Sequence, residues 1–553
     1  MGSWVNRAVF YHIYPLGFCG APQFNKNEEV QYRLDKLERW IPHFKEMNVN
    51  ALYLGPLFQS SEHGYDTKDY YQVDSRLGDN ASFKRICETL HQNGIRIVLD
   101  GVFNHVGREF WAFQDVQRNG QNSRYCGWFH NLNFGGGSPM GDPFWYEAWE
   151  GHYNLVKLNL RNPEVADHIL NAVGMWMDEF GIDGLRLDAV DCVNMDFLRR
   201  LRGFCKQKRE DFWLMGEIIH GDYNRWANPE MLDSVTNYEC YKGLYSSHND
   251  KNYFEIAHSL NRQFGNGGIY QSIYTYNFVD NHDVNRLAST LRNSAHIDNV
   301  YTLLYTMPGV PSVYYGSEWG LQGVKQNGSD AALRPCLEID CIQDADQRLA
   351  GHIASLGGVR LASSALQEGR YEQVIVKNEQ LVYRRASQEQ TIDIALNLAD
   401  CEAWLDFPCG GRVLCDLLHP GDHFEVENGR VSVLVPPCSA RILEEREELL
   451  ASAQVQPCEA RQTEELQTEG DTVCHPEQEQ EQGNERRTGR YRHFKGNEYR
   501  VIGFARHSET GEELVVYQQL YGEYALWVRP VEMFFEIVER DGQRFPRFTY
   551  LGE

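Results

Sequence analysis

The stretch GLRLDAVD, residues Gly184 to Asp191, begins like a buried strand and then carries charge. A charge in an apolar core costs several kcal/mol unless it is paired, so packing alone does not explain the pattern. On a strand, Arg186 and Asp188 point to the same side, because successive side chains alternate. The guanidinium can therefore hold the Asp188 carboxylate ionised and oriented, which suits a nucleophile. Capping of the following helix by Asp188 or Asp191 is the alternative.

Seven further apolar runs resemble this strand, and helical segments separate them up to about residue 350. Such alternation is typical of an α/β protein, and near-continuous apolar strands fit a parallel sheet buried on both faces. Eight repeats predict a closed (β/α)8 barrel. The eight runs are VFYHIYPLGF from residue 9, NALYLGP from 50, IRIVLDGVFN from 95, GLRLDAV from 184, FWLMGEII from 212, DSVTNY from 233, YTYNFVDN from 274 and VPSVYYG from 310.

Acidic residues stand at the ends of several of these strands. Glu217 ends the strand after GLRLDAV, Asp280 and Asp283 end the seventh strand beside His282, and Asp100 ends the third beside Asn104 and His105. Independent helix caps are a poor explanation for acids at four strand ends, and active sites of such barrels lie at this face. Converging carboxylates, one an ionised nucleophile and one a protonated acid, fit glycoside hydrolysis. A divalent metal site is the competing interpretation, and the arginine beside Asp188 fits it less well.

The chain divides into further regions beyond the barrel. We expect the barrel over residues 1–364, with a long inserted loop at about 104–157, and a second, antiparallel β-sandwich domain over 365–443. Residues 444–488 are rich in Glu and Gln and predict a flexible linker, and residues 489–553 predict a small β-rich domain. The inserted loop carries Trp128, Phe129, Trp145 and Trp149, which could form platforms for sugar rings or pack within the loop.

The composition of the chain excludes some classes of binding partner and indicates a compartment. The chain of 553 residues has 53 Lys and Arg against 78 Asp and Glu, a formal net charge of −25, which disfavours nucleic acid and anionic membranes. No export signal is evident at the start, and no apolar stretch is long enough to span a bilayer. The 14 cysteines show no zinc-ligand spacing and predict a reduced chain in the cytoplasm.

The motifs resemble those of one family. The order DGVFNH (100–105), GLRLDAVD, GEIIH (216–220) and FVDNHD (278–283) resembles the four signature regions of the α-amylase family of glycoside hydrolases, family 13. HGYDTKDYYQVD (63–74) and PGVPSVYYGSEWG (308–320) are also typical of that family. The resemblance covers roughly residues 8–443. The C-terminal segment resembles a small uncharacterised bacterial domain found alone or appended to other proteins, from which no activity follows.

The resemblance implies roles for residues of this sequence. Asp188 would be the nucleophile, Glu217 the general acid and base, and Asp283 the transition-state stabiliser. Arg186, His105 and His282 would assist, Tyr65 and Asp66 would hold the terminal sugar, and Asp100 and Asn104 would be largely structural. No cofactor is expected to be required. The resemblance leaves a calcium site involving Asn104 possible but does not require one. The Lys-His pair that many calcium-dependent relatives carry after the nucleophile is missing here.

Within the family, GEIIH and LVKLN (155–159) look like the neopullulanase and cyclomaltodextrinase group. Two features depart from it: the chain begins directly at the first barrel strand, without that group's N-terminal β-domain, and Ile219 stands where the group usually has Trp. The leading hypothesis is a retaining hydrolase of α-1,4 links in maltooligosaccharides. The alternatives are a transglycosylase using the same site, and a non-catalytic carbohydrate-binding protein, which the retained Asp188, Glu217 and Asp283 argue against. The oligomeric state is left open.

Overall fold

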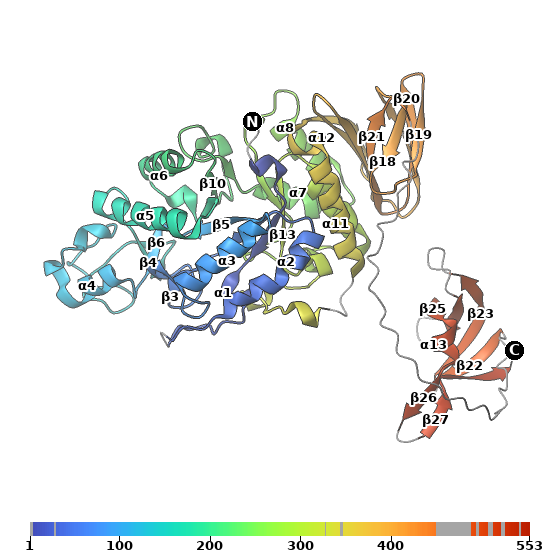
Figure 1. The fold of residues 1–553 in the computed structure, drawn as a ribbon, viewed down its shortest axis with the longest axis horizontal. Coiled ribbons are helices and arrows are strands. Elements are labelled where there is room, and N and C mark those ends of the chain that lie inside the picture. The colour runs from blue at the N-terminus through green and yellow to red at the C-terminus, as the bar shows by residue number, and fades with distance from the viewer. Residues whose placement is uncertain are drawn as a thin grey trace, which may run out of the picture. The chain divides into compact units, whose positions relative to one another are not determined.

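A computed structural model describes residues 4–26, 29–326, 328–342, 347–448, 488–493, 497–506, 513–520, 526–540 and 543–552. Contacts between Cα atoms divide the chain into two units, Met1–Ala453 and Gln454–Glu553. The first unit holds the barrel and a β-sandwich, and the second holds a small sheet (Figure 1).

The first unit is built on a closed parallel barrel. Its strands are hydrogen-bonded in the order β11-β10-β9-β5-β2-β1-β13-β12, and a parallel bridge between Thr236 and Tyr276 joins the two ends of that order. All eight strands predicted from the sequence are present, so the predicted barrel is confirmed. They are β1 (Phe10–Ile13), β2 (Ala51–Leu54), β5 (Arg96–Gly101), β9 (Gly184–Leu187), β10 (Trp213–Gly216), β11 (Ser234–Val235), β12 (Tyr276–Phe278) and β13 (Val310–Tyr314).

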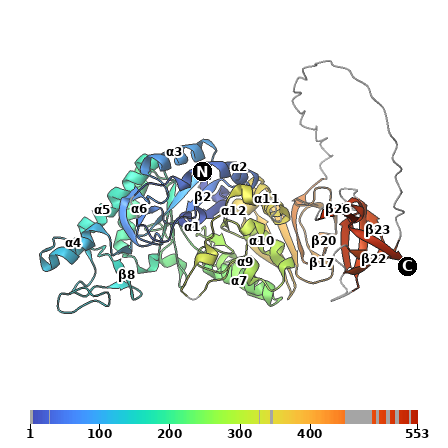
Figure 2. The same ribbon diagram turned by 90° about the horizontal axis from the view of Figure 1, so that it is seen from below.

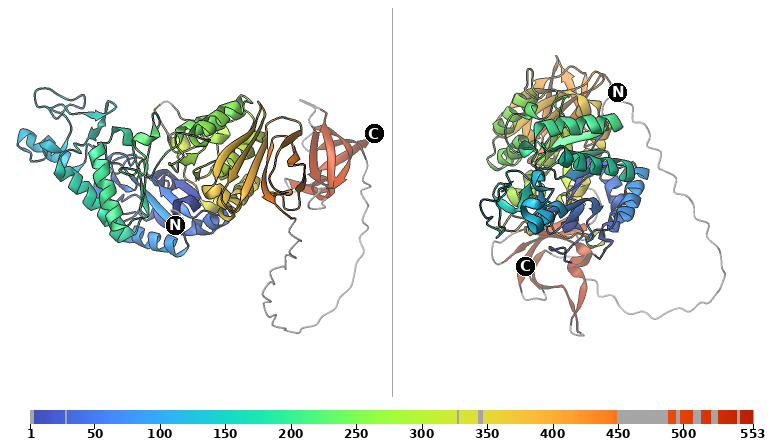
Figure 3. Two further views of the ribbon diagram at one scale, coloured as in Figure 1. Left: turned by 90° about the horizontal axis from the view of Figure 1, so that it is seen from above. Right: turned by 90° about the vertical axis from the view of Figure 1, so that its left-hand side faces the viewer.

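Helices surround the barrel and begin at polar caps. Asp79, Asn162, Asn194 and Asn237 each accept a backbone N–H near the start of the helix that follows, which satisfies a donor the helix itself cannot pair. These helices lie around the barrel (Figures 2 and 3), and their buried apolar side chains share one core with those of the strands. They are α3 (Asn80–Gln92), α5 (Pro163–Met175), α6 (Met195–Lys208) and α7 (Tyr238–Asn249); α2 (Leu37–Glu46), α8 (Phe254–Phe264), α10 (Ile297–Thr306) and α11 (Gln347–Ala362) complete the layer.

The insertion after β5 has secondary structure of its own. Strands β6 (His105–Gly107), β8 (His152–Lys157) and β7 (Ala148–Trp149) form an antiparallel sheet, and helix α4 (Trp111–Asn119) lies between β6 and β7 in the chain. The sequence predicted only a long loop here. Strands of two to six residues in a segment rich in glycine carry too little periodicity to be recognised.

The β-sandwich of the first unit is antiparallel, as predicted. Its order is β14-β15-β16-β21-β18-β19-β20-β17, with a separate apolar core around Leu405, Phe407 and Val433. It packs on the barrel through α10, where Arg385 donates a hydrogen bond to the Thr306 carbonyl. The strands are β14 (Arg370–Val376), β15 (Gln380–Ala386), β16 (Thr391–Asn397), β17 (Ala403–Pro408), β18 (Val413–Asp416), β19 (His423–Glu427), β20 (Arg430–Val435) and β21 (Ser439–Arg446).

The second unit is a small β-rich fold, again as predicted. Five antiparallel strands in the order β25-β24-β23-β22-β28 pack against helix α13 (Val531–Phe535), with Phe534 stacked on Phe548 at 4.0 Å. The strands are β22 (Gly489–His493), β23 (Glu498–Arg506), β24 (Glu513–Gln519), β25 (Leu526–Pro530) and β28 (Phe548–Gly552), with a β26 (Ile537–Arg540) and β27 (Gln543–Pro546) hairpin beside them. The linker predicted for residues 444–488 begins inside β21, and its residues 449–487 lie outside the described residues.

Candidate active site

A cavity of about 1320 Å³ opens at the carboxyl ends of the barrel strands. Asp188 follows β9, Glu217 follows β10 and Asp283 follows β12, and all three side chains line the cavity. The barrel therefore brings together the three predicted catalytic residues, which are far apart in the sequence.

Arg186 organises the floor of this cavity. Its Nη1 donates hydrogen bonds to Asp100 Oδ1 and to Asp188 Oδ1, both at 2.9 Å, and its Nη2 lies 2.7 Å from Glu217 Oε1. The Arg186 side chain is 3% exposed, so these ion pairs are shielded from water. One cation thus contacts carboxylates from three neighbouring strand ends at once.

The charge balance of this cluster departs from the sequence expectation. Burial raises the pKa of Asp188 well above its ordinary value; Arg186 opposes that rise, and the charges of Glu217 and Asp100 add to it. The expectation that Arg186 by itself keeps Asp188 ionised was therefore too simple. Three carboxyl groups share one guanidinium, so the cluster retains a proton more readily than an isolated aspartate does.

Glu217 is fixed by contacts on both carboxylate oxygens. Oε2 accepts a hydrogen bond of 3.2 Å from the Ala189 backbone N–H, and Oε1 accepts one of 3.4 Å from the Tyr238 hydroxyl. Ala189 has φ +43° and ψ +45°, a left-handed conformation that is costly for a residue other than glycine. This strained residue, directly after Asp188, links the candidate nucleophile to the candidate acid.

Asp283 is the most strongly paired carboxylate of the three. Arg334 Nη2 donates to its Oδ1 at 2.8 Å, and His282 Nε2 lies 2.9 Å from its Oδ2. Burial raises the pKa of Asp283, but His282 and Arg334 lower it further than burial raises it, so the net pKa lies well below the usual range. Asp283 therefore presents a stable negative charge to the cavity.

Two of the predicted substrate-binding residues stack beside this charge. The His282 ring is nearly parallel to the rings of Tyr14 and Tyr65, each at a centroid distance of 5.7 Å, and the Tyr65 hydroxyl lies 2.5 Å from His282 Nε2. The Tyr65 hydroxyl also donates to Asp100 Oδ2 at 3.1 Å. Tyr14 and Tyr65 line the cavity, whereas His282 and Arg186 lie behind its wall.

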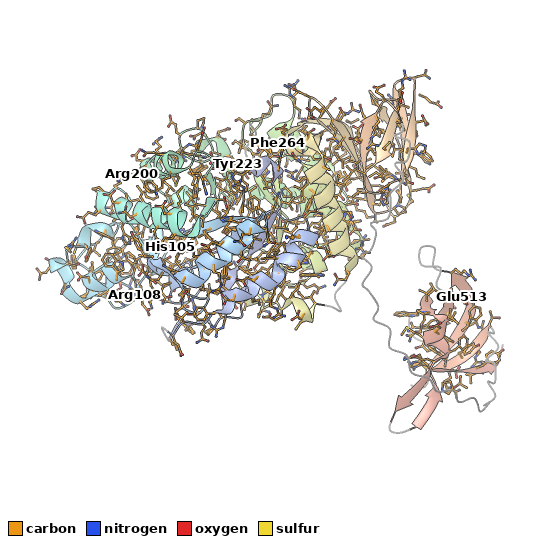
Figure 4. All side chains as sticks on the ribbon, viewed as in Figure 1. His105, Arg108, Arg200, Tyr223, Phe264 and Glu513 are labelled. Atoms are coloured by element: carbon orange, nitrogen blue, oxygen red, sulfur yellow. The ribbon has the colours of Figure 1, made fainter. Side chains whose placement is uncertain are left out.

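The other predicted residues divide by position. His105, labelled in Figure 4, lines the cavity, is buried, and has its Nε2 4.0 Å from Asp188 Oδ2. Burial lowers its pKa to about 3, so the ring is neutral. Asp66 was expected to hold a sugar, but its carboxylate accepts backbone N–H groups of residues 62–64 and does not line the cavity. Its observed contacts fix the turn that presents His63 and Tyr65.

The four aromatic residues proposed as platforms separate in the same way. Trp149 lines the cavity, with His152 stacked on it at 5.6 Å. Trp128 donates its indole N–H to Glu164, Trp145 donates to the Tyr153 hydroxyl, and Phe129 is buried. The packing alternative holds for these three, and Trp149 alone of the four faces the cavity.

Sequence reasoning missed three residues of the site. Tyr238 begins helix α7, Arg334 lies in the loop after β13, and Tyr14 follows β1. None carries a recognisable motif. Arg334 also contacts Asp330 at 3.0 Å and lies over the Tyr14 ring at 4.5 Å, so it connects two walls of the cavity.

Asn104 is buried, and its side-chain amide contacts His105 Nδ1 at 3.2 Å. In the described ranges, the one group of three His, Cys, Asp or Glu side chains at metal-ligand separation is Asp393, Cys409 and Glu445 of the sandwich. Arg384 already pairs with Asp393 and Glu445 at 2.8 Å, which opposes a cation there. Calcium binding through Asn104 stays a prediction.

The catalytic-domain model described as "Alpha amylase, catalytic domain" matches residues 34–352. The chain belongs to the α-amylase family. It is thus a glycoside hydrolase, and the resemblance noted in its motifs is confirmed. A second family model, "Protein of unknown function (DUF1653)", matches residues 489–550.

Characterised members of the α-amylase family align over most of the chain. A cyclomaltodextrinase of a Bacillus species is 31% identical over 71% of this chain and 73% of its own. The intracellular maltogenic amylase of Bacillus subtilis (strain 168) is 29% identical over 73% of this chain and 74% of its own. The cyclic α-maltosyl-(1→6)-maltose hydrolase of Arthrobacter globiformis, in its ligand-free structure, has a TM-score of 0.69 at 26% identity and covers 80% of this chain and 100% of its own. No helix in the described part of the chain is long and apolar enough to cross a membrane.

Proposed function

We propose that the protein cleaves α-1,4-glycosidic bonds of maltooligosaccharides with retention of anomeric configuration. The observation that carries this proposal is the Arg186 cluster, in which one buried guanidinium contacts both Asp188 and Glu217 on adjacent strands of the cavity floor. Two carboxyl groups held this close fit the retaining geometry, for which we expect a separation of about 5–5.5 Å.

In the proposed first step, the proton that the carboxyl cluster retains lies on Glu217, which donates it to the glycosidic oxygen while the ionised Asp188 carboxylate attacks the anomeric carbon. The bond to the leaving sugar breaks, and a covalent β-glycosyl ester of Asp188 forms. The charge of Asp283 is placed to accept hydrogen bonds from sugar hydroxyl groups, and these strengthen as the ring becomes oxocarbenium-like. The neutral His105 ring can donate a further hydrogen bond toward the same sugar.

In the second step, ionised Glu217 removes a proton from water, the water oxygen bonds to the anomeric carbon, and Asp188 leaves as a carboxylate. If a sugar hydroxyl replaces water, the same step forms a new glycosidic bond. Transglycosylation is thus the second candidate activity, and the names of the cyclomaltodextrinase and maltogenic amylase relatives favour hydrolysis.

The test follows the anomer formed first. Proton NMR during the first minutes of maltotriose cleavage, before mutarotation, should show the α-anomer; initial β-anomer would exclude Asp188 as a nucleophile. Products from maltoheptaose, cyclodextrin and pullulan would then define the linkage and distinguish hydrolysis from transfer.

We further propose that the enzyme acts in the cytoplasm. The twelve described cysteines are all unpaired, which fits a reducing compartment, and the Bacillus subtilis relative is named as intracellular. Cell fractionation with an antibody against the chain would test this placement.

A further inference from the structure

Lys36 lies outside the cavity, and its side chain is largely buried, with 11% exposed. It ends the short helical turn η2 (Arg33–Lys36), directly before α2. Its ammonium group donates to the carbonyl oxygens of Phe18 at 2.7 Å and Leu337 at 2.6 Å, and it pairs with Glu338 Oε1 at 2.7 Å. These three acceptors engage all three N–H groups of the lysine, which offsets the cost of burying its charge.

The acceptors of Lys36 belong to two segments that are far apart in the sequence. Phe18 follows β1, and Leu337 lies in the loop after β13. The two segments also contact each other directly, because the Leu337 N–H donates to the Phe18 carbonyl at 3.4 Å. Gly17 lies so close to Arg334 that a Cβ atom on the glycine would clash with the Arg334 carbonyl oxygen. Since Gly17 and Arg334 both line the cavity, Lys36 stabilises a contact between two of its walls.

The loop after β13 has little regular structure with which to place Arg334. The carbonyl groups of the two residues beside Arg334 accept hydrogen bonds from Tyr314 and Tyr315. Beyond them, Lys36 is bonded to residues 336–338 and so fixes the next part of the loop. Side-chain contacts therefore decide where this loop lies. Between β13 and α11, the described residues form the turns η9 (Ser317–Trp319), η10 (Ala331–Leu333) and η11 (Ile339–Cys341).

This loop carries the guanidinium that pairs with Asp283. Arg334 Nη2 donates to Asp283 Oδ1 at 2.8 Å, and Arg334 Nε donates to the His282 carbonyl at 3.0 Å. Such directed hydrogen bonds are lost when the loop moves by about 1 Å, because their strength falls steeply with distance and angle. The electrostatic support of Asp283 therefore depends on the position of the loop.

We propose that Lys36 is a positioning residue of the active site, which holds the loop of Arg334 in place from outside the cavity. Arg334 in turn holds Asp283. This inference rests on the proposed function of the same site, in which Asp283 acts. Lys36 does not line the cavity, so its effect reaches the reaction through Arg334.

The first test compares pH profiles of kcat/KM on maltotriose. Lys36→Met keeps the length of the side chain but removes its N–H groups, so it should lower kcat/KM about tenfold. Burial raises the pKa of Asp283, but His282 and Arg334 lower it further than burial raises it, and Arg186 adds to the lowering. A displaced Arg334 lowers this pKa less, so the acid limb of the profile should move to higher pH.

Three further variants accompany Lys36→Met. Lys36→Gln can still donate to two carbonyl groups, so it should show smaller changes in the same direction, and it replaces Lys36→Met if circular dichroism shows that variant to be unfolded. Lys36→Arg keeps the charge and should lose less activity than either. Arg39→Met is the matched control: it removes an ion pair from α2 to Asp340 of the same loop, but both side chains are more than half exposed, so its profile should match the wild type.

A double variant tests the route of the effect. In an Arg334→Leu background, Lys36→Met should leave the acid limb where Arg334→Leu alone places it, because the group through which Lys36 acts is gone. A further shift, or coincident profiles of a folded Lys36 variant and the wild type, would overturn the role of Lys36 while leaving the hydrolase proposal intact. A wild-type enzyme that does not cleave maltotriose would instead overturn the proposed function.

Discussion

At the scale of single residues, Arg186 determines how the active site is arranged. Its guanidinium contacts Asp100, Asp188 and Glu217, and each of these carboxylates stands at the end of a different strand. The direction of the Arg186 side chain therefore sets the positions of the nucleophile and the acid relative to each other. Replacing this buried arginine would leave three carboxylates without their cation, which is strongly destabilising.

Loss of either reacting carboxylate should remove activity. We expect Asp188→Ala to abolish cleavage of maltooligosaccharides and Glu217→Gln to lower kcat by about 10²–10⁴-fold, because each group has a role that the other does not replace. Circular dichroism should confirm that both variants fold. Near wild-type kcat in either folded variant would refute the assignment.

The pairing of Asp283 predicts a change in pH dependence. The pKa of Asp283 is held low by His282 and Arg334 against the effect of burial, so Arg334→Leu should raise it. Asp283 would then protonate at a higher pH, and the acid limb of the kcat/KM profile should move upward.

Asp330→Asn provides the matched control for that measurement, since it removes the other carboxylate partner of Arg334 and keeps the contact to Asp283. The acid limb of the kcat/KM profile of Asp330→Asn should stay close to that of the wild type. Coincident profiles for Arg334→Leu and the wild type would show that Arg334 does not set the charge of Asp283.

At the scale of helices and strands, the two ends of the barrel have different tasks. The carboxyl ends carry the site, whereas Asp183, just before β9, joins strands and a helix at the opposite end. It accepts hydrogen bonds from the Ile97 backbone N–H, Arg96 and His91, each at 2.9 Å. In this fold, side-chain contacts at the amino-terminal face of the barrel contribute to stability and not to catalysis.

Asp183→Ala should therefore destabilise the protein by about 1–3 kcal/mol with little effect on kcat at low temperature. Burial raises the pKa of Asp183, but His91 and the Ile97 N–H lower it more, so the net pKa is depressed. A depressed carboxylate pKa stabilises the fold above the unfolded value of about 3.9 and ceases to do so as pH falls through the folded value.

Denaturant unfolding at several pH values checks this prediction. The stability difference between wild type and Asp183→Ala should be full near neutral pH and shrink below about pH 4. A stability difference that grows as the pH falls would contradict the depressed pKa assigned to Asp183. A large loss of kcat at equal stability would place Asp183 in the active site instead.

Elements also show where prediction from sequence succeeds. The eight strands were predictable, because parallel strands buried on both faces leave short apolar runs that end in polar residues. The three-stranded sheet of the insertion was not, since its strands are only two to six residues long. Asp188, Glu217 and Asp283 were found because they follow strands, whereas Tyr238 and Arg334 stand on a helix and a loop that reach the cavity only in the folded chain.

At the scale of the whole molecule, the site belongs to the first unit alone. Among the described residues, those that line the cavity all lie before residue 335. The sandwich strand β21 ends at Arg446, which pairs with Val413 of β18. A truncation after Glu448 should therefore leave this strand complete.

A protein ending at Glu448 should accordingly hydrolyse short maltodextrins at nearly the wild-type rate. The reason is that the second unit has its own apolar core and forms a separate body of contacts. Steady-state kinetics of the purified truncation on maltotriose would check it, with thermal unfolding as the control for folding. A large fall in kcat at unchanged stability would show that the second unit contributes to catalysis.

The cavity wall has one more consequence, for the kinds of sugar it admits. Among the described residues that line it, seven are acidic and three are lysine or arginine, so the formal charge of the lining is negative. Neutral glucans enter without electrostatic cost, whereas a phosphate or uronate group on the sugar would be repelled. We expect maltooligosaccharides to be cleaved and their phosphorylated counterparts to be rejected, most strongly at low ionic strength, where screening is weakest. The carboxylates that carry out the reaction would therefore also select neutral glucans over glucans that carry anionic groups.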